Sequence, residues 1–334
     1  MSEIRENRIT GEWVIIAPER ANRGGMLLRP AEQKDVPSFW KDCPFCPGNE
    51  SATTEERFSF KTEDGKWLVR SIINKFSVLS PAGEVTSPGS TLSSEASVNG
   101  VGLHEVVIEA SRHDLSMAVM PVGHLHRILE AYRHRFLEFY RDARVQHVII
   151  FKNHGADAGA SQQHPHSQIV GLPIVPGQVA ERIERSRRSF IDSGRCLACT
   201  QIVQELDQQC RIIAENSDFV AFIPYAALSQ YHLWIFPKAH VACFSEQPIK
   251  TISALADILR IVLAKIHGML DNPPFNLVIR SLSPREKDVP HFHWYISIVP
   301  RIGKRAGFEL GTGIYVNSSS PEASAQALRD FGVS

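Results

Sequence analysis

Residues 153–173 read N-H-G-A-D-A-G-A-S-Q-Q-H-P-H-S-Q-I-V-G-L-P, and this stretch decides the fold. It follows the apolar run V-I-I-F at 148–151, which is typical of a buried strand. Its first part is rich in Gly, Ala and Ser, so it predicts a loop whose backbone amides can approach a ligand closely. Pro165 separates His164 from His166 and keeps the second part out of a helix.

The two histidines and the following amide are expected to share one face of a strand. Residues two apart in a strand point to the same side, which groups His164, His166 and Gln168. Two imidazoles and an amide beside a loop of small residues suit a phosphate site with a histidine nucleophile. The alternative, on this stretch alone, is a structural metal ligand next to a histidine that only packs in the core.

The composition is that of an ordinary globular protein. The chain has 334 residues, 43% hydrophobic and 22% charged, which allows one large domain or two of ordinary size. It has 36 basic and 36 acidic residues, and a net charge of zero argues against a general nucleic-acid or membrane-surface role. No apolar stretch reaches transmembrane length and no signal-peptide pattern opens the sequence, so we expect a cytoplasmic protein.

Four of the six cysteines form two C-x-x-C pairs, at 43/46 and 196/199. In a reducing compartment such pairs more often bind metal than form disulfides. Zinc takes thiolate and imidazole ligands tetrahedrally. The first half offers one complete zinc-binding set: Cys43, Cys46, His113 and His164.

The second half offers a similar set: Cys196, Cys199, His240 and either His291 or His293. We therefore expect two structural Zn²⁺ ions per chain, although the second set could hold another divalent metal. The alternative for each cysteine pair is a redox centre or plain packing in the core.

An internal repeat is indicated by two landmarks. His113 and His240 are separated by 240 − 113 = 127 residues, and His166 and His293 by 293 − 166 = 127 residues. We expect two copies of one α+β unit, a short antiparallel sheet with a helix across it, in domains at 1–176 and 177–334. The polar stretch at 80–101 is interpreted as a surface loop inserted in the first copy. The alternative is two unrelated halves with coincidental spacing.

His166 is the better nucleophile because a metal-bound nitrogen gives its lone pair to the metal. A backbone carbonyl could accept a hydrogen bond from its Nδ1–H and leave Nε2 free to attack phosphorus. Gln168 can hydrogen-bond a phosphoryl oxygen, and its counterpart in the second half is Tyr295. The asymmetry predicts one active and one scaffolding half. The remaining histidines, His104 among them, are expected to be packing or surface residues.

The motifs C-P-F-C, S-R-H-D, N-x-G-A-x-A-G-A-S and H-P-H-S-Q together resemble the galactose-1-phosphate uridylyltransferases of the histidine triad superfamily. The resemblance extends over residues 8–314. It implies an α+β fold of two histidine-triad-like halves, a homodimer, and a role in galactose or related carbohydrate metabolism. It also implies transfer of a nucleoside monophosphate through a covalent nucleotidyl-histidine.

The resemblance assigns roles residue by residue. It makes His166 the nucleophile, Gln168 its phosphate-contacting partner, and the set of Cys43, Cys46, His113 and His164 the first zinc site. It places three further residues at nucleotide- or phosphate-contacting positions: Asn74, Asn153 and Ser161.

Other motifs resemble the ADP-glucose phosphorylase branch of this family. They are S-Q-I-V at 167–170, the second cysteine pair, and G-F-E-L-G-T-G at 307–313. In that branch His293 matches the second-site ligand, whereas the repeat alignment favours His291. Phe308 and Glu309 match contacts to the sugar or phosphate end.

We therefore expect a nucleotidyltransferase that acts on a nucleotide sugar, with a sugar 1-phosphate or phosphate as the second substrate. The base, uracil or adenine, stays open. One alternative is a non-enzymatic zinc or nucleotide-binding module, which would not need His166 and Gln168. Another is hydrolysis or phosphorolysis of dinucleoside polyphosphates.

Overall fold

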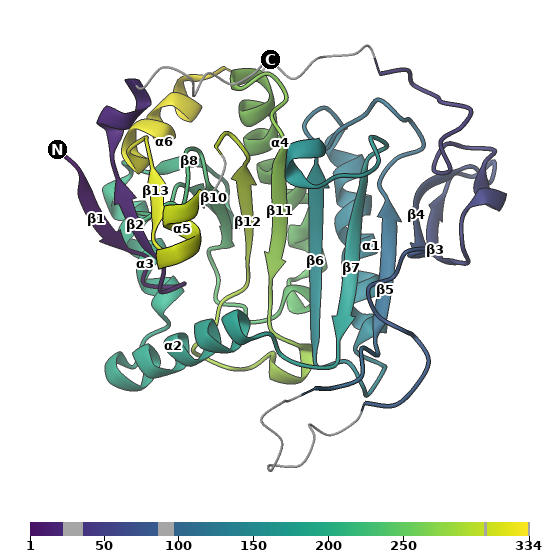
Figure 1. Cartoon of the computed structure of the whole chain (residues 1–334), viewed down its shortest axis with the longest axis horizontal. Helices are drawn as coiled ribbons and strands as arrows, with labels where there is room; N and C mark the ends of the chain where they lie inside the picture. The colour runs from purple at the N-terminus through teal and green to yellow at the C-terminus, as the bar shows by residue number, and fades with distance from the viewer. Residues whose placement is uncertain (23–35, 86–96, 304–305, 333–334) are drawn as a thin grey trace.

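The computed structural model describes residues 1–22, 36–85, 97–303 and 306–332. Its centre is one ten-stranded antiparallel sheet with the strand order β3-β4-β5-β7-β6-β11-β12-β10-β9-β8 (Figure 1). The first five strands in this order come from the first half of the chain and the last five from the second half. The two halves thus share one sheet.

The first half supplies β3 (Glu56–Lys61), β4 (Trp67–Ile73), β5 (Leu103–Ile108), α1 (Val122–Phe139), β6 (His147–His154) and β7 (His166–Leu172). The second half supplies β8 (Ile212–Glu215), β9 (Phe219–Phe222), β10 (Leu233–Pro237), α4 (Ile252–Met269), β11 (Phe275–Arg280) and β12 (Tyr295–Pro300). Each half runs three strands, a helix and two strands, and in each the last strand lies between the third and the fourth. The predicted α+β repeat is confirmed, while the domain boundary at residue 176 stays a prediction.

The halves join where β6 pairs with β11. The register places Asn276 opposite Asn153 and Val278 opposite Phe151. Two sheets were predicted. The structure instead joins them edge to edge, so each of the two central strands has a hydrogen-bonded neighbour on both sides.

Helices α1 and α4 cover one face of the sheet and pack against each other (Figure 1). Apolar residues recur at helical spacing along α1, and all of these are buried: Leu125, Ile128, Leu129, Tyr132, Phe136 and Phe139. They form the main core together with the apolar face of α4. Because strand residues alternate between faces, His166 and Gln168 project from the other face of the sheet, where no helix of the repeat lies.

The remaining elements cover part of that second face. They are a small sheet of β1 (Glu3–Glu6), β2 (Trp13–Ile16) and β13 (Tyr315–Asn317), with α2 (Gly177–Ser193), α3 (Leu197–Gln208) and α5 (Gly307–Thr312); helix α6 (Pro321–Asp330) packs instead against β8 and α4. Helix α2 was not predicted because it is rich in Arg and Glu and only Ser186 in it is fully buried. Of the predicted loop at 80–101, residues 86–96 lie outside the described residues, and a bridge between Ser80 and Val101 closes its base. None of the described helices combines the length and apolar character that crossing a bilayer needs.

Candidate active site and metal centres

The first predicted metal set comes together at the end of the sheet where β7 begins. Cys43 and Cys46 lie on a tight turn in which the Cys46 N–H donates to the Cys43 carbonyl at 3.2 Å. His113 follows β5 and His164 precedes β7. All four side chains are buried, and one donor atom from each lies within 4.8 Å of the other three.

The distances in this set fit a tetrahedral zinc ion. The Nδ1 atoms of His113 and His164 are 3.3 Å apart, and Cys46 Sγ is 3.6 Å from each. Zinc bonds of about 2.0–2.1 Å to nitrogen and about 2.3 Å to sulfur give tetrahedral edges of about 3.4 Å and about 3.6 Å. The set therefore has the spacing of a closed four-ligand site.

The tautomer of His164 also suits a ligand. Its Nε2–H donates to the Ala110 carbonyl at 2.7 Å, so Nδ1 carries the lone pair that faces the cysteines. Burial lowers the pKa of His164 to about 4, which keeps the ring neutral as a metal ligand must be.

The second set gathers Cys196, Cys199, His240 and His293. Cys199 Sγ lies 3.3 Å from His240 Nδ1 and 3.4 Å from His293 Nδ1, and the Val289 carbonyl accepts from His240 Nε2 at 3.1 Å. The imidazole of His291 is not part of the set, so the structure favours the predicted His293 over the alternative. Unlike the first set, this one reaches the surface, because His240 is exposed and Cys199 half-buried.

His166 is the first residue of β7 and one side of its ring stays available. Its Nδ1–H donates to the His164 carbonyl at 2.9 Å, so Nε2 carries the lone pair and makes no hydrogen bond to the described residues. Burial, and next the charge of Lys152, lower the pKa of His166. The ring is therefore held in the neutral form that can act as a nucleophile. The Phe45 ring, 5.7 Å away between centroids, packs beside it.

Gln168 accepts a hydrogen bond from a histidine that the sequence analysis assigned to packing or the surface. His104 Nδ1 accepts the Val78 N–H at 3.2 Å, so its Nε2–H can donate to Gln168 Oε1 at 2.9 Å. Asn74 Nδ2 lies 2.9 Å from the same Nε2. His104 is buried, as expected of a packing residue, and its contact leaves the Gln168 amide NH₂ group for a ligand oxygen. Strand alternation could have found it, because His104 faces the same side as Gln168 on the neighbouring strand.

Asn153 is oriented from the second half of the chain. Asn276 Nδ2 donates to Asn153 Oδ1 at 2.8 Å and to the Ala158 carbonyl at 2.9 Å, which holds the small-residue loop against β11. Gly155 and Gly159 in this loop have φ of 79° and 88°, where other residues are strained. Ser161 is exposed further along the same loop.

Behind His166, on the helix face of the sheet, lies a buried ion pair that the sequence analysis missed. Lys152 Nζ donates to Glu109 Oε2 at 2.7 Å and to the His166 carbonyl at 3.0 Å. The hydroxyls of Tyr132 and Ser167 donate to the other Glu109 oxygen. Lys152 follows the buried Val148 and Ile150 at two-residue spacing along β6, so all three lie on the same face of the strand. This pattern could have predicted that Lys152 is buried.

Phe308 and Glu309 are not brought to His166 within one chain. They line a separate groove with Arg20 and Asn276, and among the described residues none of their hydrogen bonds or ring contacts reaches the nucleophile. Their contact with a substrate stays a prediction.

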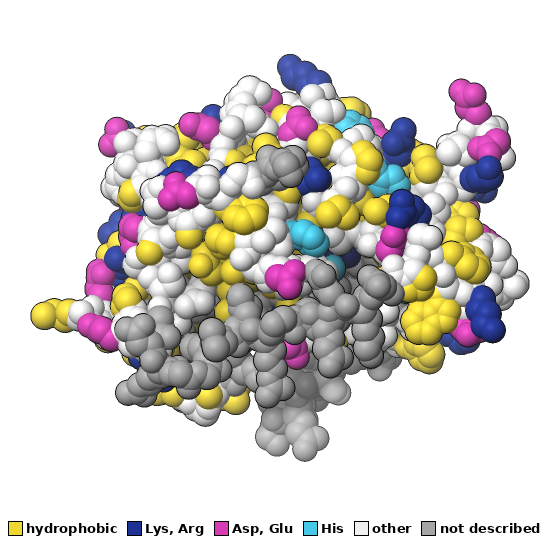
Figure 2. All heavy atoms as spheres, turned by 90° about the horizontal axis from the view of Figure 1, so that it is seen from above, with side chains coloured by type: hydrophobic (Ala, Val, Ile, Leu, Met, Phe, Trp, Pro, Cys, Tyr) yellow, Lys and Arg dark blue, Asp and Glu magenta, His cyan; other side chains and the backbone are white. Residues whose placement is uncertain are grey.

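The surface at this end of the sheet carries mixed charges. Figure 2 looks down on it and shows histidine side chains between basic and acidic ones, with neither sign forming a continuous patch. The arrangement suits a small polar ligand held by a few specific groups.

Comparisons with known proteins cover the whole chain. A family model described as the N-terminal domain of galactose-1-phosphate uridyl transferase matches residues 1–176, and one described as a domain of unknown function matches residues 135–330. ADP-glucose phosphorylase from Arabidopsis thaliana is 34% identical, covering 99% of this chain and 93% of that protein. Galactose-1-phosphate uridylyltransferase from Thermotoga maritima is 26% identical, covering 100% of this chain and 99% of that protein.

The fold is also found among solved structures. The crystal structure of the Arabidopsis thaliana ADP-glucose phosphorylase with bound ADP-glucose superposes with a TM-score of 0.85 and 31% identity. The match covers 100% of this chain and 100% of that chain.

The two metal sets should differ in how fast they release metal. A chelator reaches the half-exposed second set more readily than the buried first set. We expect about two zinc ions per chain, given four ligands in each set, and a two-phase release measured by metal analysis during chelation. Cys196→Ser should remove the fast phase and Cys43→Ser the slow phase. Folded, active protein that carries no metal would contradict both sites.

Removing Lys152 should destabilise the fold by about 3–5 kcal/mol, because the Glu109 carboxylate is left buried without a cation. Chemical denaturation of Lys152→Met measures this loss. The double variant Lys152→Met/Glu109→Gln should recover most of it, since the amide oxygen still accepts the two hydroxyls. Lys238→Met is the matched control, because its pair with Glu215 is partly exposed and contributes less than about 1 kcal/mol. If the single and double variants lost the same free energy of unfolding, the loss would not come from the unpaired Glu109 carboxylate.

Proposed function

The chain belongs to the galactose-1-phosphate uridylyltransferase family, and on that premise we propose that it transfers a nucleoside monophosphate from a nucleotide sugar through a covalent bond to His166. The observation that carries the proposal is the state of this ring. Its Nδ1–H is occupied by the His164 carbonyl, and its neutral Nε2 is free on the face that carries Gln168.

In the first step His166 Nε2 attacks the α-phosphorus of the nucleotide sugar. The bond from phosphorus to the bridging oxygen breaks, and sugar 1-phosphate leaves with the electron pair. A phosphate leaving group needs no strong general acid. The ring becomes positively charged as the new bond forms, and the His164 carbonyl stabilises this charge through the Nδ1–H.

In the second step an oxygen of the incoming phosphate compound attacks the same phosphorus. The bond to Nε2 breaks, and its electron pair returns to His166, which is neutral again. The amide NH₂ groups of Gln168 and Asn153 and the hydroxyl of Ser161 would hold the non-bridging oxygens in both steps. Because one site serves both half-reactions, the kinetics are ping-pong.

We propose Zn²⁺ in both metal sets. Four protein ligands make each site closed and structural, so the ion supplies rigidity rather than a reacting group. The first ion would fix His164, whose carbonyl orients His166. The second would scaffold the other half, and that set could hold another divalent metal.

For the substrates we propose ADP-glucose as donor and inorganic phosphate as acceptor. The S-Q-I-V segment, the second cysteine pair and the 34% identical Arabidopsis thaliana relative support this choice. Uridylyl transfer from UDP-glucose to galactose 1-phosphate is the second candidate, supported by the family model over residues 1–176 and the Thermotoga maritima relative.

We further propose that the enzyme works in the cytoplasm as a homodimer with domains at 1–176 and 177–334. Asn74 would contact the nucleotide, and Phe308 and Glu309 the sugar or phosphate end. The family resemblance supports these assignments. A zinc module without activity would have no use for the free nitrogen of His166 beside Gln168.

Substrate choice can be read from the covalent intermediate. Radiolabelled ADP-glucose and UDP-glucose, each labelled in the α-phosphate, are incubated separately with the enzyme, which is then denatured and counted. We expect ADP-glucose to label the protein more strongly, and added phosphate to remove the label. Strong labelling by UDP-glucose alone, discharged only by galactose 1-phosphate, would establish the second candidate instead.

His166→Gly should form no labelled protein and lose at least about 10⁴-fold in turnover, as when other nucleophiles are removed. A preformed nucleoside 5′-phosphoimidazolide should restore transfer, because it places an imidazole leaving group where His166 was. His164→Gly is the contrasting variant, which should lose metal and melt lower without such rescue. Wild-type turnover by His166→Gly without imidazolide would indicate direct transfer between the two substrates.

A further inference from the structure

The second half contains a modified counterpart of the reaction site. The offset of 127 residues pairs Asn153 with Arg280 and Gln168 with Tyr295, while His166 pairs with His293, which belongs to the second metal set. The second half therefore lacks a free nucleophile but has gained an arginine where the first half has an amide.

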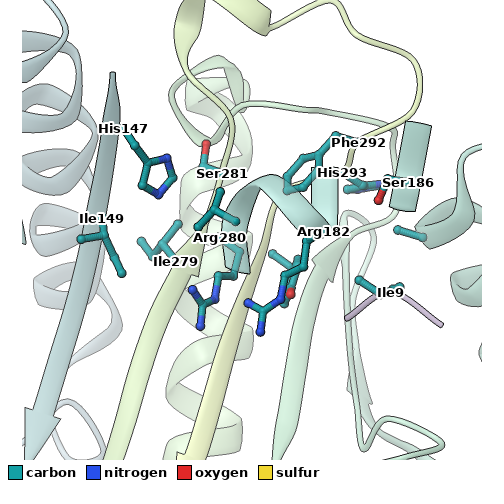
Figure 3. Close-up of a pocket in the computed structure, with 13 residues that line it drawn as sticks. Ile9, His147, Ile149, Arg182, Ser186, Ile279, Arg280, Ser281, Phe292 and His293 are labelled. Atoms are coloured by element: carbon teal, nitrogen blue, oxygen red, sulfur yellow. The ribbon is translucent and has the colours of Figure 1, made fainter. Parts of the chain in front are cut away.

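A small cavity lies at this counterpart position (Figure 3). It is lined by strands β6, β11 and β12 and by helix α2, so it lies at the junction of the two halves. Its lining includes two arginines and two histidines, Arg182, Arg280, His147 and His293, but no carboxylate. The two arginines are the charged groups of this lining, since His147 is neutral and His293 belongs to the second metal set.

Arg280 is a cation without a partner. Its guanidinium makes no hydrogen bond or ion pair to the described residues, whereas Arg182 Nη2 is 2.9 Å from Glu12 Oε1. Burial and the charge of Arg182 lower the pKa of Arg280, although Tyr295 and Glu12 oppose this. Burial and Arg280 together lower the pKa of His147 to about 4. The Glu12 carboxylate thus pairs with Arg182 and not with Arg280. The positive charge of Arg280 therefore stays uncompensated in a mostly enclosed space.

The two arginine side chains are arranged as a pair. Figure 3 shows them side by side, one from α2 and one from β11, with both guanidinium groups pointing the same way. Adjacent like charges repel each other unless an anion lies against both. A guanidinium group binds a tetrahedral oxyanion through two parallel N–H donors. Arg182 and Arg280 can each supply one such pair of donors.

The size of the cavity limits the ligand. Its volume of about 20 Å³ exceeds the roughly 10–15 Å³ that one water needs, but is far too small for a nucleotide or a sugar phosphate. We propose that Arg182 and Arg280 bind one small inorganic oxyanion of the phosphate type at the junction of the halves. This site is separate from the reaction site, and the bound ion links α2 of the connecting segment to β11 of the second half.

Thermal unfolding tests the proposal. At constant ionic strength, replacing chloride by phosphate should raise the melting temperature of the wild-type protein by about 2 °C or more, by mass action on the folded state. Arg280→Met should lose most of this increase. Arg141→Met, an exposed arginine paired with Glu138, is the matched control and should keep it. Phosphate is also the proposed acceptor, so Gln168→Ala should lose only the part that comes from binding in the reaction site and should keep the part that Arg280→Met loses.

Two further results separate ion binding from a purely structural role of Arg280. In chloride, Arg280→Met should melt no lower than the wild type, since a half-buried charge without an ion-pair partner among the described residues is removed. Crystals of the wild-type protein grown with selenate should show an anomalous peak between the two guanidinium groups. Equal phosphate stabilisation of wild type and Arg280→Met, or no peak at that position, would overturn the proposal.

Discussion

The hydrogen bond from His166 Nδ1–H to the His164 carbonyl is the interaction on which the proposed active site depends. It fixes the tautomer of the nucleophile, and its acceptor belongs to a residue whose own ring lies in the first metal set. On the other side of the strand, Lys152 donates to the carbonyl of His166 and pairs with Glu109. The backbone around the nucleophile is therefore held from both faces of the sheet.

The repeat shows how one scaffold serves two purposes. In the first half the metal set uses His164 and leaves His166 free, whereas in the second half it uses His293, the counterpart of His166. The histidine ligand of the second half lies two residues further along its strand than the ligand of the first half. It stays on the same face, but it occupies the position that the nucleophile has in the first half. A histidine at this position can therefore act either as a nucleophile, as in the first half, or as a metal ligand, as in the second, but not as both.

Much of the fold and of the metal sets could be predicted from the sequence, because helical periodicity, C-x-x-C spacing and a constant offset are local or additive signals. The apolar positions of α1 and the first metal set are examples, whereas His293 was chosen through the family resemblance and against the repeat alignment. The missed features depend on tertiary contacts. Lys152 can be buried because Glu109, directly after β5, pairs with it, and His104 lies beside Gln168 only through the register of β5 with β7. Helix α2 carries Val179, Ile183 and Phe190 at helical spacing, so it could have been predicted and was missed among its many charged residues.

The continuous pairing of β6 with β11 leaves no hinge between the halves. Asn276 crosses that junction to hold Asn153 and the small-residue loop, so any rotation of one half against the other would break the ladder and the loop support together. Substrates would then exchange without domain opening, over the face of the sheet opposite α1 and α4. The departing sugar phosphate and the incoming acceptor would use the same entry route, so the first would have to leave before the second could bind.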